Sequence, residues 1–81
     1  MVKIFCERIQ YLRKRNNKTR ANIAKVVNVS STTIYRWEKG LRSPKITYAI
    51  KLADYFCVSL DYLLGLKNEP NKTTNQKINQ Q

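Results

Sequence analysis

The sequence predicts an all-α domain of five short helices. Three observations support this fold class. Apolar residues recur at intervals of three and four, Ser or Thr precedes three of the apolar segments as a helix cap, and Asn or Gly follows most of them. At 81 residues the chain is long enough for one compact core. We therefore expect one domain over residues 1–65 and a polar, disordered tail over residues 66–81, where Asn, Gln, Lys and Thr predominate.

The first helix is expected from Val2 to about Arg15. Within this range Phe5, Ile9 and Leu12 recur at i, i+4 and i+7, which places them on one face of an amphipathic helix. The pair Asn16-Asn17 follows, and Asn tolerates the left-handed backbone conformation that ends helices. We therefore expect the first loop to begin there.

A second helix is expected over about Arg20–Val27, with Thr19 as its N-cap. Asn22 occupies the position at which a Glu or Gln would form a stronger capping box. Its apolar residues Ile23, Ala24 and Val27 fall on one side.

The third helix follows after a turn of only three residues, 28–30. Ser30 can cap a helix from Ser31 to about Lys39, and Gly40 ends it. Ile34 and Trp37 form its inward stripe. Two short helices joined by such a tight turn form a helix-turn-helix arrangement.

Two further helices complete the predicted fold. Pro44 restricts the residue before it to extended geometry, and a fourth helix is expected over about Ile46–Phe56. Ser59 then caps a short helix, Leu60–Leu64, which Gly65 ends. The inward face of the fourth helix is expected to comprise Ile46, Ala49, Ile50, Ala53 and Phe56.

The charge of the chain indicates its class of partner. The formal net charge is +11 at pH 7, more than solubility requires, and indicates nucleic acid or an anionic membrane surface. Residues 1–65 contain thirteen Lys or Arg and four Asp or Glu, which gives this part a net charge of +9. No apolar run approaches the roughly 18 residues of a membrane span, and no secretory signal begins the chain. We therefore expect a cytoplasmic protein that binds nucleic acid.

Metal and catalytic sites find little support in the sequence. It contains no histidine and two cysteines, Cys6 and Cys57, so a zinc site is not expected. We expect both thiols to be reduced and buried, with a disulfide between them as the alternative. No nucleophile–base pair and no glycine-rich phosphate loop is present, so neither an enzymatic activity nor a cofactor is expected. The acidic residues before position 66 are scattered singly: Glu7, Glu38, Asp54 and Asp61.

Three segments carry a resemblance to a known family. They are TRANIA over residues 19–24, VSSTTIYRWEKG over 29–40 with the following Pro44, and KLADYFCVSLDYLLG over 51–65. Together they resemble the Cro and cI phage-repressor helix-turn-helix family, the XRE-type bacterial transcriptional regulators. The resemblance implies a five-helix lambda-repressor-like domain whose third helix lies in the major groove of double-stranded DNA.

The resemblance also implies roles for individual residues. Base edges would be contacted by Ser31, Thr32 and Arg36, of which Arg36 can donate two parallel hydrogen bonds to a guanine. The family pairs an arginine late in the first helix with a glutamate near the end of the third, which implies an ion pair between Arg13 and Glu38. Contacts to DNA phosphates are assigned to Thr19, Arg20, Thr33, Tyr35, Lys39, Arg42 and Lys45.

Four positions depart from the family pattern. Arg20 replaces the usual Gln, and Lys18 occupies a position that is usually apolar. Lys45 replaces a capping Ser, which leaves Ser43 or solvent to satisfy the first donors of the fourth helix. Cys57 falls where Asn or Gly normally adopts positive φ, so mild backbone strain is expected there.

Several features have a second interpretation. Trp37 and the tyrosines could stack on unpaired bases, but core packing is favoured for Trp37, and Tyr35 is either a DNA contact or simply exposed. The cluster 13–15 is interpreted as a solvated basic face rather than a membrane or phosphate surface. The tail is interpreted as an inert end, with Lys72 and Lys77 as weak electrostatic contributors in the alternative.

The expected function is that of a transcriptional regulator, most simply a repressor, that binds a palindromic operator as a homodimer. One recognition helix covers only a few base pairs, so specificity usually requires two half-sites. The surface expected for pairing comprises Val58, Leu60, Leu63, Leu64 and Leu66, although these residues could instead close the core. Alternatives are an antitoxin or anti-repressor module, and a nonspecific nucleic-acid packaging protein.

Overall fold

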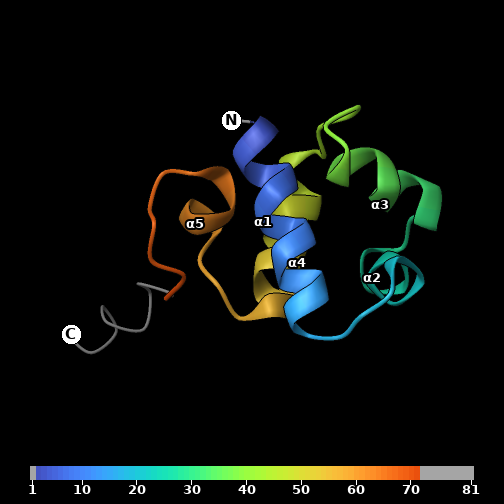
Figure 1. Cartoon of the computed structure of the whole chain (residues 1–81), viewed down its shortest axis with the longest axis horizontal. Coiled ribbons are helices and arrows are strands. Elements are labelled where there is room, and N and C mark those ends of the chain that lie inside the picture. The colour runs from blue at the N-terminus through green and yellow to red at the C-terminus, as the bar shows by residue number, and fades with distance from the viewer. Residues whose placement is uncertain (1, 72–81) are drawn as a thin grey trace.

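The computed structural model describes residues 2–71, and within them it contains five α-helices (Figure 1). The all-α fold class and the five-helix order predicted from the sequence are confirmed. The third helix ends one residue earlier than expected, and Lys39 is its C-cap. The helices are α1 (Val2–Arg15), α2 (Arg20–Val27), α3 (Ser31–Glu38), α4 (Ile46–Phe56) and α5 (Leu60–Leu64).

Hydroxyl side chains begin three of the helices, as expected. The Thr19 hydroxyl accepts a hydrogen bond from the Asn22 amide at 3.0 Å, and the Asn22 side-chain oxygen accepts one from the Thr19 amide at 2.9 Å. The shorter Asn therefore completes a capping box that usually contains Glu or Gln. Ser30 and Ser59 cap α3 and α5 through the Thr33 and Tyr62 amides.

The hydrophobic core joins side chains from all five helices. Ile9, Ile23, Ile34, Leu52 and Leu63 are fully buried. In Figure 1, α2 and α3 lie at one end of the molecule and α5 lies at the other. Helix α1 contacts α3 and α5, and α4 contacts α2 and α5, so these two longer helices connect the ends. The pair α2–α3 is thereby fixed on a rigid support.

The inward face of α4 differs from the expected one. Ala49, Ala53 and Phe56 are buried as predicted, but Ile46 and Ile50 are 52% and 44% exposed. Leu52, which was not assigned to the core, is fully buried. Positions 49, 52, 53 and 56 lie on one face of a helix, and so do positions 46, 49, 50 and 53. Because α4 packs against α2 and α5, the first of these two faces is the buried one.

The two cysteines do not behave as expected. Neither forms a disulfide within the described part of the chain; Cys6 is half-buried and Cys57 is exposed. The expectation of two buried thiols is therefore wrong for Cys57. This residue is the C-cap of α4 with φ of 58°, the left-handed conformation predicted at this position.

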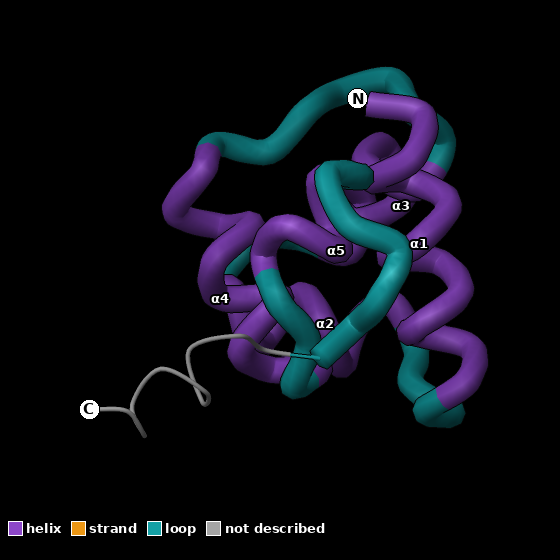
Figure 2. The backbone as a smooth tube through the Cα atoms, turned by 90° about the vertical axis from the view of Figure 1, so that its left-hand side faces the viewer, coloured by secondary structure: helices purple, strands orange, loops and turns teal. Residues whose placement is uncertain are grey.

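The segment after α5 is tied to the body as far as it is described. The Arg8 guanidinium donates hydrogen bonds to the carbonyl oxygens of Tyr62 and Lys67 and, at 3.1 Å, to the Asn68 side chain. The Ser59 amide donates to the Pro70 carbonyl at 2.9 Å, so the segment returns along α5 (Figure 2). Residues 67 and 70 of the predicted tail are therefore hydrogen-bonded to the body, whereas residues 72–81, including Lys72 and Lys77, lie outside the described residues.

The apolar residues near α5 divide between core and surface. Val58 and Leu63 are buried and close the core, which was the alternative to a pairing surface. Leu60 and Leu64 are half-buried, and Leu66 is exposed. None of the helices in residues 2–71 has the length and apolar character needed to cross a membrane.

Candidate nucleic-acid interface

Helix α3 has one side buried in the core and one polar side exposed to solvent. Ile34 and Trp37 point into the core, where Trp37 is 3% exposed and its ring centroid lies 5.5 Å from that of Tyr48. The side chains of Ser31, Thr32 and Arg36 are exposed. The predicted orientation of α3 is therefore confirmed, and the three candidate base-contacting residues lie on a surface that the core holds in place.

A shallow hollow of about 340 Å³ lies on the α2 side of α3. It is lined by Arg20, Ala21, Ser31, Thr32 and Tyr35. The Tyr35 ring is exposed and lies close to two cations, with the Arg20 guanidinium carbon 5.1 Å and the Lys39 ammonium 5.7 Å from its centroid. Tyr35 is therefore a surface residue that packs against charged groups of both helices.

A second hollow of about 300 Å³ lies on the opposite side of α3. Its polar lining comes from Thr33 and Arg36 of α3 and from the residues that lead into α4: Arg42, Ser43 and Lys45, with Trp37 and Tyr48 among the deeper residues. The N-cap Lys45 makes no side-chain cap hydrogen bond to the first turn of α4 within the described residues. Arg36, Arg42 and Lys45 therefore line one hollow that extends to the first turn of α4, an arrangement that favours anions.

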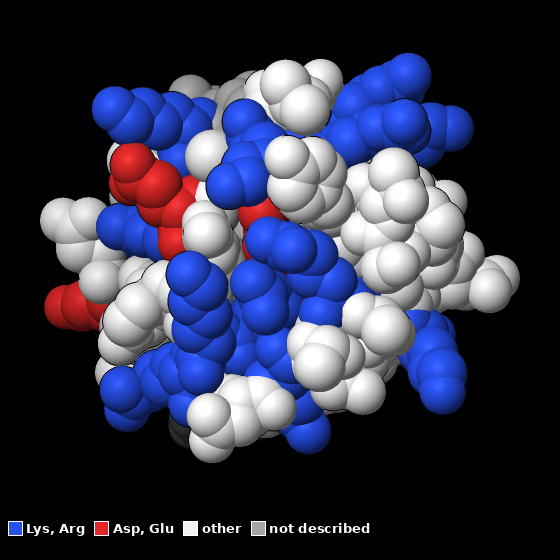
Figure 3. All heavy atoms as spheres, turned by 45° about the vertical axis from the view of Figure 1, so that its right-hand side comes forward, with Lys and Arg blue, Asp and Glu red and all other residues white. Residues whose placement is uncertain are grey.

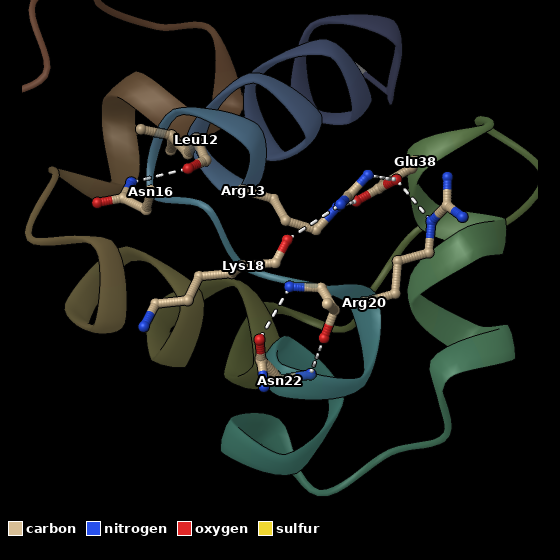
Figure 4. A network of polar contacts seen from close by, with 8 residues as sticks. Leu12, Arg13, Asn16, Lys18, Arg20, Asn22 and Glu38 are labelled. Carbon is tan, nitrogen blue, oxygen red and sulfur yellow. Dashed lines mark hydrogen bonds and ion pairs between the residues drawn. The ribbon is translucent and has the colours of Figure 1, made fainter.

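A buried carboxylate connects the first three helices (Figure 4). Glu38 of α3 has a side chain that is 0% exposed, and its Oε2 lies 2.6 Å from Nε of Arg13 on α1. Arg13 also donates from Nη2 to Glu38 Oε1 and from Nη1 to the Lys18 carbonyl. The ion pair expected between Arg13 and Glu38 is present, and its two parallel contacts hold α1 against α3.

The same carboxylate contacts a second arginine, which the sequence did not predict. Nε of Arg20, the first residue of α2, lies 2.9 Å from Glu38 Oε1. The interacting residues are 18 positions apart, so no local pattern could have indicated the contact. Arg20 is thus both a candidate phosphate contact and a partner of Glu38.

The remaining candidate phosphate contacts differ in how much of each side chain is available. Lys39, Arg42 and Lys45 are exposed. The Thr19 hydroxyl is exposed but caps α2, and the half-buried Thr33 hydroxyl lies 3.0 Å from that of Ser30. The backbone positions of these two threonines are therefore fixed by local hydrogen bonds.

Positive charge covers much of the face on the α2–α3 side (Figure 3). Lys and Arg side chains occupy its centre, while most of the acidic atoms in view lie toward one edge. In the basic cluster 13–15, Arg13 is committed to Glu38, and Lys14 and Arg15 are exposed, with Arg15 donating to the Tyr11 hydroxyl at 3.5 Å. Lys14 and Arg15 therefore fit the interpretation as a solvated basic face.

The chain matches a known family and is similar to several transcriptional regulators. Residues 9–63 match the family model described as helix-turn-helix. The chain is 27% identical over 74 residues to YobD of Bacillus subtilis (strain 168), named as an uncharacterized HTH-type transcriptional regulator; the match covers 91% of this chain and 66% of that protein. It is 36% identical over 59 residues to the cryptic phage CTXphi transcriptional repressor RstR of Vibrio cholerae, covering 73% of this chain and 53% of RstR.

A solved structure agrees with the fold. The P22 c2 repressor, solved in complex with synthetic operator 9T, superimposes with a TM-score of 0.70 at 32% identity, covering 73% of this chain and 89% of that one. The matches to YobD and RstR cover less than two thirds of the length of either relative.

Proposed function

The chain belongs to the helix-turn-helix family, and from this premise we propose that it is a transcriptional repressor that binds a palindromic operator in double-stranded DNA as a homodimer. The observation that carries the proposal is the geometry of α3. One face of this helix is buried in the core, and the other is exposed. On the exposed face, Ser31 and Thr32 line the hollow that contains Arg20, and Arg36 lines the hollow that contains Arg42 and Lys45. Its similarity to the P22 c2 repressor and to RstR supports the same function.

In this proposal α3 enters the major groove, and its exposed side chains contact base edges. Arg36 donates two hydrogen bonds to O6 and N7 of a guanine, the contact for which a planar guanidinium is best suited. Ser31 and Thr32 begin the helix and contact bases through hydroxyls, which can donate or accept, while the Thr32 methyl packs on a thymine methyl. Arg36 therefore provides the strongest base preference.

Phosphate contacts flank this helix on both sides. Arg20 and Tyr35 line the α2 hollow, and Thr19 directly precedes Arg20 as the N-cap of α2. Thr33, Arg42 and Lys45 line the hollow next to α4. Lys39 extends the same surface at the end of α3. Such contacts set the position of the protein on DNA without selecting a sequence, and they make affinity depend on salt.

The homodimer follows from the size of the recognition element. At about 1.5 Å per residue, the eight residues of α3 span roughly 12 Å, so they contact only a few base pairs. Two copies on half-sites about 34 Å apart supply the missing specificity. The half-buried Leu60 and Leu64, with the exposed Leu66, form the apolar surface near α5 that we assign to pairing. The protein acts in the cytoplasm by occupying DNA, without catalysis or a cofactor.

Selection of bound duplexes from a random pool tests this function. We expect enrichment of a palindromic sequence with guanines at symmetric positions, because two copies of α3 would contact the half-sites in the same way. Sedimentation of the complex with the enriched duplex should give two chains per duplex. A pool that stays random after several rounds, with equal affinity for all duplexes, would contradict sequence-specific binding and favour nonspecific packaging.

A further inference from the structure

The two arginines that contact Glu38 differ in how many of their guanidinium nitrogens donate hydrogen bonds within the protein. Arg13 uses Nε and Nη2 for Glu38 and Nη1 for the Lys18 carbonyl, so its donors are directed into the protein. Arg20 uses only Nε, and its two terminal nitrogens make no hydrogen bond to an acceptor in residues 2–71. Figure 4 shows these two nitrogens on the side of the guanidinium that faces away from Glu38.

The surroundings of Arg20 fix the plane of its guanidinium as well as its direction. Its Nε is held at 2.9 Å by a carboxylate that is itself fully buried, and the group lies over the Tyr35 ring. The side chain is nevertheless 36% exposed and borders the hollow that contains Ser31 and Thr32. A long, flexible side chain is therefore held with its donor edge open to solvent beside the recognition helix.

We propose that Glu38 is a positioning residue for phosphate binding, and that it presents the outer edge of Arg20 to one phosphate beside the groove that α3 enters. This inference rests on the proposed DNA-binding function. Two parallel N–H donors match the geometry of a phosphate, which a lysine ammonium cannot reproduce. Because Glu38 holds the guanidinium of Arg20 in place before DNA binds, the side chain does not lose conformational entropy on binding. Such a loss would lower affinity by about 2- to 10-fold per side chain.

The charge balance of the cluster is compatible with this role. Glu38 alone would repel a phosphate, but Arg13 already neutralises it through two contacts. Two guanidinium groups and one carboxylate leave a net charge of +1, and that excess is exposed on Arg20. The carboxylate therefore orients Arg20 without cancelling the attraction of the cluster for an anion.

A double-mutant cycle on DNA binding tests the proposal. Affinity for the selected duplex is measured at several salt concentrations for the wild-type chain, Arg20→Ala, Glu38→Gln and the double variant, with circular dichroism to verify folding. Each phosphate contact lowers the log of the binding constant by about 0.9 for a tenfold increase in salt concentration, so its loss changes the ratio of the binding constants at 0.1 M and 1 M salt about 8-fold. We expect Arg20→Ala to weaken binding about 10-fold in the wild-type chain and less than 3-fold in the Glu38→Gln chain.

The cycle separates the possible failures. An equal loss on Arg20→Ala in both backgrounds would overturn the positioning role of Glu38 while leaving the proposed function intact. No loss in the wild-type background would exclude Arg20 from phosphate binding and overturn the inference as well. A wild-type chain that binds no duplex would refute the proposed function itself. Lys25→Ala, which removes one exposed charge from the same helix, is the matched control and should change the salt dependence by less than half as much.

A second variant keeps the proposal testable if Glu38→Gln does not fold. Arg20→Lys preserves the charge but loses the planar fork that can contact Glu38 and a phosphate at the same time. We expect its affinity to lie closer to that of Arg20→Ala than to that of the wild type. An affinity closer to the wild type would show that Arg20 acts by charge alone, and would overturn the positioning role.

Discussion

Replacement of Arg36 by alanine separates sequence recognition from folding in this protein. Arg36 is exposed on α3, and no hydrogen bond or ion pair joins its side chain to any residue of the described range. Its removal should therefore change the free energy of unfolding by less than about 0.5 kcal/mol, as at other exposed positions. Any larger effect on DNA binding would then report on the contact with DNA.

The expected magnitude follows from the contact proposed. A bidentate arginine–guanine pair contributes about 1–3 kcal/mol of discrimination against the wrong base, or roughly 5- to 150-fold. In a dimer both half-sites lose this contact, so discrimination should fall by about 2–6 kcal/mol for the whole operator. Affinity for duplexes that already lack the guanine should fall far less, by the loss of one cation per half-site.

The assay is competitive binding of the enriched duplex and of single-base variants of it, for the wild-type and Arg36→Ala chains. The wild-type chain should disfavour substitution at one symmetric pair of positions, and Arg36→Ala should tolerate all four bases there. Lys45→Ala is the control, because an exposed cation at a phosphate should weaken all duplexes equally. If Arg36→Ala behaves in the same way as this control, Arg36 is a phosphate contact and the proposed assignment is wrong.

Three further predictions concern stability, measured by urea denaturation or thermal melting followed by circular dichroism. Trp37→Ala should cost about 3–5 kcal/mol of the roughly 4–12 kcal/mol expected for a chain of this size, because Trp37 is buried; a cost below 1 kcal/mol would contradict its place in the core. Cys57→Gly should stabilise the fold by about 0.5–1 kcal/mol, because the exposed Cys57 adopts φ of 58° at a cost that glycine avoids; a lower melting temperature would refute this source of strain. Gly65→Ala should destabilise by about 2–4 kcal/mol, because φ is 83° and the added Cβ would lie 2.9 Å from Ile4 Cγ2; truncation of Ile4 to alanine removes Cγ2 but keeps the Ile4 Cβ at 3.1 Å, so it should recover only part of the loss, and full recovery would exclude a backbone contribution.

The helix boundaries were predictable because they depend on local chemistry. Thr19, Ser30 and Ser59 cap helices through amides three residues ahead, and Asn28 and Gly65 end helices through their own backbone conformation. These interactions lie within one turn of the chain, so the sequence around each residue contains the necessary information.

The side chains that were wrongly or incompletely assigned depend on contacts between distant elements. Ile50 and Leu52 are both apolar residues of α4, and only the packing of α2 and α5 determines that Leu52 is buried. The contact of Arg20 with Glu38 likewise requires α2 and α3 to be placed against each other. The pair of Arg13 and Glu38 could be expected only through family resemblance, since nothing in the spacing of these residues implies it.

The attachment of residues 67–70 along α5 determines where the described part of the chain ends. Arg8 and the Ser59 amide hold this segment at the α5 end of the molecule, whereas α3 lies at the opposite end (Figure 1). A fluorophore, affinity tag or second protein joined after Asn71 would therefore start on the side remote from α3. Such a fusion would leave the recognition helix accessible and would place its cargo beside the residues that line the same hollow as Asn71, among them Tyr11, Arg15 and Cys57.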